Sequence, residues 1–400
     1  MKSYEQYLRD SAVPKSVIDS FLDSSKMNWA QFDPELGYTL SNSMQHNGVG
    51  NCWTISTVNC SGARTSHRYA NRPCRINTYG NSFTECHQVS DGETWQEYLA
   101  GHLGEPIRNF GVGGYGVYQA YRRMLRTEQS DLGVRYVMLY IWGDDHMRSI
   151  MRCRHAVIYP WFNSAKGKPF HANFWANVEM DLRTRQLVEK ESLLPTPESL
   201  YRMSDPDFMW KSLNDDLMVQ LHCLQSDDVD PASIDLAPLN TLADILGVSS
   251  IDKDNIKLSA ARVKQSYAFS VTMDVIQKAD RFCRSTGKEL MILLMCPAAT
   301  RQLLQGEARY DQEIADYLVE NKFRHFDMNV AHRVDHECFK LSVEDYMNRY
   351  LIGHYNPAGN HLFAYALKDS LVPWLDPKPL TYCGDASPVI DFKGYLPDAT

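Results

Sequence analysis

Short apolar runs alternate with amphipathic stretches along much of the chain. Four of these runs have the length of buried strands: 74–79, 134–142, 289–295 and 323–328. Helical spacing is clear in the segment 94–104, where Trp95, Leu99 and Leu103 recur every fourth residue. Such alternation predicts an α/β fold, a three-layer α/β/α sandwich with a mainly parallel sheet and a binding crevice at the carboxyl ends of its strands.

Further helices are predicted between and after these strands. The segments 118–126 and 301–322 have helical patterns. The last helix is expected to begin after Asn356, because Asn is a favoured cap and Pro357 suits the first helical position. It should run to about Val372, just before Pro373.

The regular alternation does not extend over the whole chain. Residues 1–73 contain two polar helical stretches and then turn-rich, strand-like segments, which predict an N-terminal extension. The α/β domain is expected at 74–375, interrupted by an insertion at about 146–287 where the pattern is mixed. Residues 376–400 form a proline-rich C-terminal tail.

The composition is that of an ordinary globular protein and excludes several classes of partner. Of 400 residues, 44% are apolar and 22% charged, and the net charge of −8 has the wrong sign for a general binder of nucleic acid. No apolar stretch approaches the ~20 residues of a membrane helix, and no signal peptide is evident. Ten cysteines stand singly, which predicts reduced thiols and a cytoplasmic location. The alternative is an exported, disulfide-bonded protein whose signal has been removed.

Three polar blocks follow predicted strands or precede a predicted helix. The first is the segment 80–84, GNSFT, where Ser82 lies at a strand-to-helix turn and can present its hydroxyl to the crevice. The second is the segment 109–114, NFGVGG, whose glycines let backbone amides approach a substrate. The third places His354 just before the last helix, a firm mount for a general base. Taken singly, each block is more typical of turn and cap chemistry than of a catalytic site.

In this order and separation, the three blocks resemble the SGNH or GDSL-like hydrolase family, of which the chain would be a divergent member. The resemblance covers 74–145 and 288–375. It implies the flavodoxin-like fold of that family, with Ser82 as the nucleophile, His354 as its base, and the amides of Ser82 and Gly114 in the oxyanion hole. Asn81 stands where the family usually has Asp.

The third family block ends in an Asn that donates to the oxyanion, and here the segment 142–145, WGDD, sets Asp144 in that place. A carboxylate cannot donate a hydrogen bond. Either burial beside Asp145 keeps Asp144 protonated, or Asp144 does another job, such as capping a helix, and two amides form the oxyanion hole. Losing one donor commonly costs about 10²-fold to 10³-fold in rate.

A second departure concerns the residue that orients the histidine. The family usually has Asp three residues before it, and this chain has Leu351. Asp345, Glu344 or a backbone carbonyl are alternatives, since the role is to hold the tautomer of the ring. A dyad of Ser82 and His354 is favoured, with Asp345 as a possible third member.

The function implied is that of a serine esterase that hydrolyses a carboxylic ester, a short acyl or acetyl ester of a small molecule or carbohydrate, through an acyl-serine intermediate. No metal or organic cofactor is implied. Asn81, Asp145 and Asn356 are expected to contact substrate. The alternatives are an O-acyltransferase that uses the same serine, and a catalytically weak binding protein on the same fold.

Two other groups of residues deserve a functional interpretation. His332 and His336 stand four residues apart and would suit zinc on a helix face, but a polar surface turn is favoured there. Arg148, Arg152 and Arg154 lie at the start of the insertion, where they face an anionic substrate or form a solvated, ion-paired helix face. An insertion rooted beside this block is well placed to shape the pocket.

Overall fold

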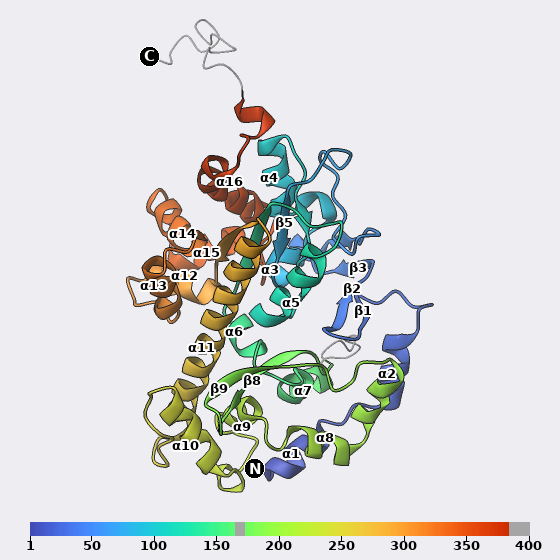
Figure 1. Ribbon diagram of the computed structural model, residues 1–400, viewed down its shortest axis with the longest axis vertical. Coiled ribbons are helices and arrows are strands. Elements are labelled where there is room, and N and C mark those ends of the chain that lie inside the picture. The colour runs from blue at the N-terminus through green and yellow to red at the C-terminus, as the bar shows by residue number, and fades with distance from the viewer. Residues whose placement is uncertain (165–172, 384–400) are drawn as a thin grey trace, which may run out of the picture.

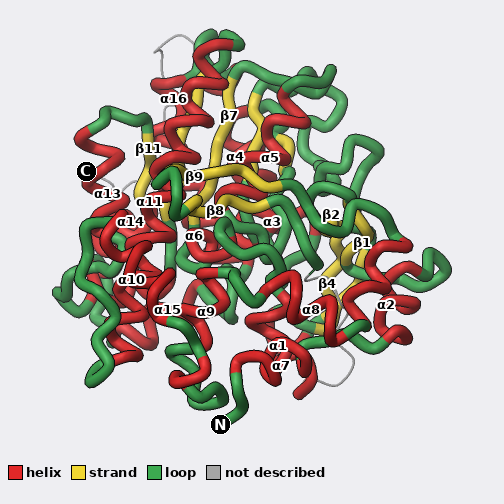
Figure 2. The backbone as a smooth tube through the Cα atoms, turned by 60° about the horizontal axis from the view of Figure 1, so that its bottom comes forward, coloured by secondary structure: helices red, strands yellow, loops and turns green. Residues whose placement is uncertain are grey.

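A computed structural model describes residues 1–164 and 173–383 of the chain, and its centre is a five-stranded parallel sheet (Figures 1 and 2). The strands are β5 (Ile76–Tyr79), β6 (Arg108–Asn109), β7 (Tyr136–Ile141), β10 (Glu289–Leu294) and β11 (His325–Asp327). Their spatial order is β6-β5-β7-β10-β11. Numbered by their sequence, this is 2-1-3-4-5, the flavodoxin-like order.

Helices cover both faces of this sheet. The helices α5 (Val117–Glu128) and α11 (Ile256–Ser285) pack on one face, and the other is covered by α4 (Trp95–Leu103), α14 (Met328–Glu337) and α16 (Pro357–Trp374). Strand β7 is buried throughout: Val137, Leu139 and Ile141 belong to the core on the α5 side, and the alternate residues belong to the core on the α16 side. The predicted three-layer α/β/α architecture is confirmed.

Local sequence rules explain where the helices begin and end. Thr94 caps α4 by accepting from the Glu97 amide, and α16 begins after Asn356 as predicted, although it continues past Pro373 to Trp374. The prediction of one helix over 301–322 is wrong. The structure has α12 (Pro297–Leu304) and α13 (Gln312–Glu320), separated by Gly306 at a left-handed φ of 75°.

The first part of the chain forms two helices and two small antiparallel hairpins. These are α1 (Tyr4–Asp10), α2 (Lys15–Leu22), β1 (Ala30–Asp33), β2 (Gly37–Leu40), β3 (Ser43–His46) and β4 (Trp53–Ser56). Figure 1 shows α1 beside α8 (Pro206–Leu213), where Tyr4 and Trp210 meet edge to face with ring centroids 5.9 Å apart. The N-terminal segment therefore packs against the segment that links β7 to β10.

That linking segment, predicted as an insertion, contains α6, α7, the β8-β9 hairpin, α8, α9, α10 and α11. The bounds not yet given are α6 (Asp145–Arg148), α7 (His155–Ser164), β8 (Asn177–Asp181), β9 (Gln186–Lys190), α9 (Leu217–Cys223) and α10 (Leu236–Ile245). Its last helix, α11, packs on β10 and α5 in the layer that covers the sheet. Of the tail 376–400, residues 384–400 lie outside the described residues.

Two further findings bear on the sequence predictions. All ten cysteines are free thiols, as predicted. Within the described ranges, no helix combines the length and apolar character required to cross a membrane. The cytoplasmic location stays a prediction.

Candidate active site

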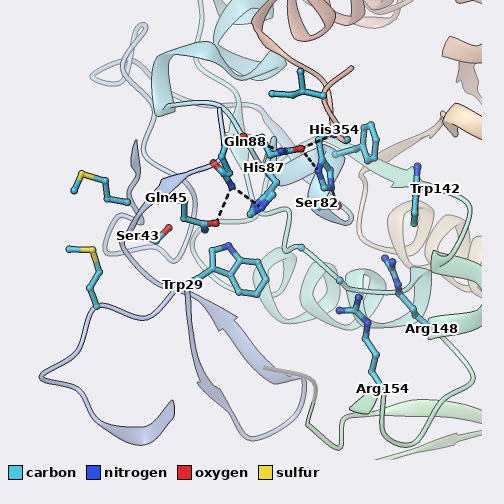
Figure 3. A pocket seen from close by; sticks show the side chains of 18 residues that line it. Trp29, Ser43, Gln45, Ser82, His87, Gln88, Trp142, Arg148, Arg154 and His354 are labelled. Carbon is cyan, nitrogen blue, oxygen red and sulfur yellow. Dashed lines mark hydrogen bonds between the residues drawn. The ribbon is translucent and has the colours of Figure 1, made fainter. Parts of the chain in front are cut away.

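The three blocks singled out in the sequence converge at the carboxyl edge of the sheet. Ser82 opens the short helix α3 (Ser82–Glu85) directly after β5, Gly114 follows β6, and His354 lies in the loop before α16. The strand order reverses between β5 and β7, which is where open α/β sheets bind their ligands. Ser82, Gly114 and His354 all line one cavity of about 730 Å³ (Figure 3).

The serine and the histidine are in hydrogen-bond contact. The Nε2 atom of His354 lies 2.8 Å from the Oγ atom of Ser82. This separation lets the ring accept the hydroxyl proton as the oxygen becomes a nucleophile. The two residues are 272 positions apart in the chain, so tertiary structure alone brings them together.

The other ring nitrogen of His354 faces Gln88. Nδ1 lies 2.9 Å from Oε1 of Gln88, and that oxygen also accepts from the His354 backbone N–H at 2.9 Å. The Gln88 Nε2 group donates to the carbonyl oxygen of Asn47 at 3.0 Å, which fixes the orientation of the amide. Because Oε1 can only accept, Nδ1 carries the ring proton and Nε2 is left to accept from Ser82.

Gln88 thus occupies the position of a triad acid, and the prediction of Asp345 for that role is wrong. Asp345 is exposed at the start of α15 (Val343–Tyr350), where its carboxylate accepts from the Ser342 hydroxyl at 2.6 Å. No local signal in the sequence points to Gln88. In the structure, Gly353, at a φ of 107°, makes room for it: a Cβ there would lie 2.9 Å from Oε1 of Gln88.

The electrostatic surroundings keep His354 neutral. Burial, together with repulsion from Arg148, lowers the pKa of the His354 imidazole to about 3. The ring is therefore a ready base at neutral pH. When His354 is protonated, its Nδ1–H group faces the uncharged amide of Gln88 rather than a carboxylate.

The backbone around the two amides predicted to bind an oxyanion, those of Ser82 and Gly114, is well defined. Ser82 is the first residue of α3, so its N–H has no helical acceptor. In the β6 loop, the Gly113 amide donates to Oε2 of Glu85 at 2.7 Å, which fixes the loop beside Gly114. Gly114 has a φ of 85°, and a Cβ on it would overlap Nη1 of Arg154, so only glycine fits.

The two aspartates after β7 do not play their predicted parts. The Asp144 side chain is 55% exposed and lies 3.4 Å from Arg148. It does not line the cavity, so its assignment as an oxyanion donor is wrong. The buried carboxyl is Asp145, which accepts from the Trp142 amide at 2.9 Å and from the Asn81 side chain. Burial raises the pKa of Asp145 to about 7.

The three residues predicted to contact substrate instead hold the backbone, and none of them lines the cavity. Asn81 caps α3 by accepting from the Phe83 amide at 2.7 Å, and its amide nitrogen donates to Asp145. Asn356 accepts from the Gly359 amide and donates to the Arg349 carbonyl, each at 2.9 Å. With both ends of each side chain engaged, the prediction is corrected to a supporting role.

The cavity walls come from two segments outside the family-like blocks. The N-terminal segment supplies Met27, Trp29, Ser43, Met44, Gln45 and Asn47. Trp29 is tied to the site, since its indole N–H donates to Oε1 of Glu85 at 3.1 Å. Sequence reasoning missed this wall, because nothing in a turn-rich segment indicates where it packs. The start of the linking segment supplies Arg148 and Arg154.

The rival histidine pair lies on a helix, so the prediction of a surface turn there is wrong. His332 is buried in α14, with its ring nitrogens 3.0 Å from the Tyr346 hydroxyl and 2.6 Å from the Tyr355 hydroxyl. His336 faces the Leu341 carbonyl at 3.0 Å. Across the described residues, no cluster of three or more His, Cys, Asp or Glu side chains is arranged to hold a metal ion.

Comparisons with known proteins yield little. No family model matches the sequence, and no curated protein matches it. Among solved structures, the chain is similar to a member of the lipolytic protein G-D-S-L family from Veillonella parvula. The two are 10% identical, the match covers 74% of this chain and 97% of that chain, and the TM-score is 0.35. A likeness of this extent assigns no activity to the chain.

Proposed function

We propose that the protein is a serine esterase that hydrolyses a carboxylic ester of a small molecule or carbohydrate. The observation that carries the proposal is the hydrogen-bonded series from Gln88 through His354 to Ser82, with contacts of 2.9 Å and 2.8 Å, at the edge of a cavity. A nucleophile, its base and the group that orients the base are the parts that acyl transfer requires.

The chemistry follows from these positions. His354 Nε2 takes the Ser82 proton while Oγ attacks the ester carbonyl, and the amides of Ser82 and Gly114 stabilise the resulting oxyanion. The bond to the alkoxy group then breaks, and the imidazolium returns its proton to the departing alkoxide. A water molecule, deprotonated by His354, attacks the acyl-serine and releases the acid, and the proton returns to Ser82.

The test is covalent labelling combined with product analysis. A fluorophosphonate probe should add to Ser82, located by peptide mass spectrometry, and short-chain p-nitrophenyl esters should be hydrolysed. Ser82→Ala should abolish both, whereas Ser285→Ala, an exposed serine at the end of α11, should abolish neither. Turnover that persists in Ser82→Ala would exclude the proposal. Transfer of the acyl group to an added alcohol in preference to water would identify an acyltransferase instead.

The pH dependence of kcat/KM should report the low basicity of His354. Its lowered pKa, about 3, means that the neutral base persists as the pH falls past the ordinary imidazole range of about 6.5. We therefore expect the acid limb assigned to His354 to lie well below about pH 6. Arg148→Gln removes a positive charge and should move this limb upward.

Asp145, unlike His354, is expected to titrate near neutrality, since burial raises its pKa to about 7. Asp145→Asn serves as the control that separates its contribution from that of His354. A limb that stays at the ordinary imidazole value in wild type and does not move in Arg148→Gln would contradict the assignment.

A further inference from the structure

Two cationic side chains line the cavity beside Ser82, although the chain as a whole carries a net charge of −8. Its 18 described lining residues include two arginines, Arg148 and Arg154, and neither Asp nor Glu. A cleft lined by one sign of charge concentrates the opposite sign of ligand. The lining is therefore suited to an anion.

The direct partner of Arg154 is a hydroxyl: its guanidinium donates to Tyr38, and Asp144 attracts it only from beyond contact distance. The neighbouring Arg152 pairs with Glu179 and Asp215, but within the described part of the chain no carboxylate lies within salt-bridge distance of Arg154. Burial lowers the pKa of Arg154 only to about 10, so it stays charged at neutral pH. A half-buried guanidinium with no carboxylate in contact can pair directly with an anionic ligand.

Arg148 is held in place by two carboxyl groups, Asp144 at 3.4 Å and Asp145. Its Nη1 group donates to Asp145 at 3.1 Å, and that carboxyl also accepts from Trp142 and Asn81. Its guanidinium lies over the Trp142 ring, 5.1 Å from the centroid. Figure 3 shows the guanidinium groups of Arg148 and Arg154 close together on the side of the cavity below Ser82.

The position of Arg154 relates this charge to the reaction centre. A Cβ on Gly114 would overlap Nη1 of Arg154, so the guanidinium lies directly against the glycine of the oxyanion loop. Ser43 and Gln45 lie at the opposite end of the cavity (Figure 3). Both of these side chains are uncharged. An anion on Arg154 would thus sit a few bonds from a carbonyl attacked by Ser82.

We propose that Arg148 and Arg154 form an anion subsite, and that the ester cleaved at Ser82 carries an anionic oxygen group, such as a carboxylate, near its carbonyl. This inference rests on the proposed esterase function and names its substrate class. Arg154 is the main anchor, because Arg148 already shares its charge with Asp145. The planar guanidinium binds a carboxylate or phosphate through two parallel hydrogen bonds.

The kinetic test compares two esters of equal acyl length, p-nitrophenyl valerate and the mono-p-nitrophenyl ester of glutaric acid, which ends in a carboxylate. Wild type should prefer the charged ester by about tenfold or more. Arg154→Gln should lower kcat/KM for the charged ester about tenfold to a hundredfold more than for the neutral ester. Arg185→Gln, which alters an exposed arginine paired with Asp244, should change neither.

Equal turnover of both esters by wild type would overturn the subsite. An equal loss on both esters in Arg154→Gln would also overturn the subsite. The guanidinium would then contribute to the reaction of every ester and would not recognise the charge of the substrate. Retained turnover of the neutral ester shows that the variant has folded.

A binding measurement separates failure of the subsite from failure of the esterase proposal. In Ser82→Ala protein, calorimetry should detect glutarate but not its uncharged diamide, and Arg154→Gln in that background should lose the glutarate signal. Glutarate binding without hydrolysis of any ester would leave the subsite standing and the esterase proposal refuted. Ester hydrolysis without charge discrimination and without glutarate binding would refute the subsite and leave the esterase proposal standing.

Discussion

Ser82→Ala and His354→Ala are each expected to lower kcat for ester hydrolysis on the order of 10⁴-fold or more. The reason is the 2.8 Å contact between Nε2 and Oγ: without the base, the hydroxyl stays protonated, and without the hydroxyl, no acyl-enzyme forms. The two residues act as a unit, so the double variant should be little slower than either single variant.

The measurement is kcat and KM on a short p-nitrophenyl ester for the wild type, both single variants and the double variant. His361→Ala is a matched control, since His361 is an exposed histidine of α16 that meets the Tyr98 ring edge to face. It should keep wild-type rates. Losses in the two single variants that multiply in the double variant would show that Ser82 and His354 act independently and would contradict the dyad.

The parts of this site that the sequence predicted are those with strong local signals. Ser82, Gly114 and His354 each stand at a glycine turn or a helix cap, and the alternation of strands and helices places such ends at one edge of a parallel sheet. The same local logic predicted the start of α16 at Asn356. Where a local sequence signal and the packing of the fold agree, the position of a site residue can be predicted from a single sequence.

The parts that it missed depend on contacts between distant segments. Gln88 reaches His354 across 266 positions, and the Trp29 wall packs on Glu85 from a turn-rich segment. After β7, the third family block suggested Asp144, but α6 begins one residue later and buries Asp145 instead. No periodicity or motif reports which of two adjacent carboxylates turns inward.

Gln88→Met should lower kcat by about 10²-fold to 10⁴-fold with little change in KM. Methionine has a similar length but offers no acceptor for the Nδ1–H and backbone N–H groups of His354, which both now bind Oε1 of Gln88. Without that acceptor, the tautomer with a free Nε2 is no longer held, and the effect of the wrong tautomer in serine proteases is of this size. Gln129→Met, at the exposed end of α5, is the control and should be silent.

Gln88→Glu tests the same position from the other side. The carboxylate keeps an acceptor at Nδ1 and adds a negative charge there, so the pKa of His354 should rise from its present value of about 3 and the acid limb of kcat/KM should move upward. Its kcat should exceed that of Gln88→Met.

The same substitution carries a cost in stability. The second carboxylate oxygen would face the Asn47 carbonyl, which now accepts from Nε2 of Gln88 at 3.0 Å. Two acceptors in contact cost roughly 1–3 kcal/mol, measurable by thermal or denaturant unfolding. If the acid limb of kcat/KM does not move in Gln88→Glu, the residue at position 88 does not set the pKa of His354. If the acid limb moves upward and stability falls, glutamine at position 88 stabilises the fold by donating to the Asn47 carbonyl. The same residue then leaves His354 a weaker base than a glutamate would.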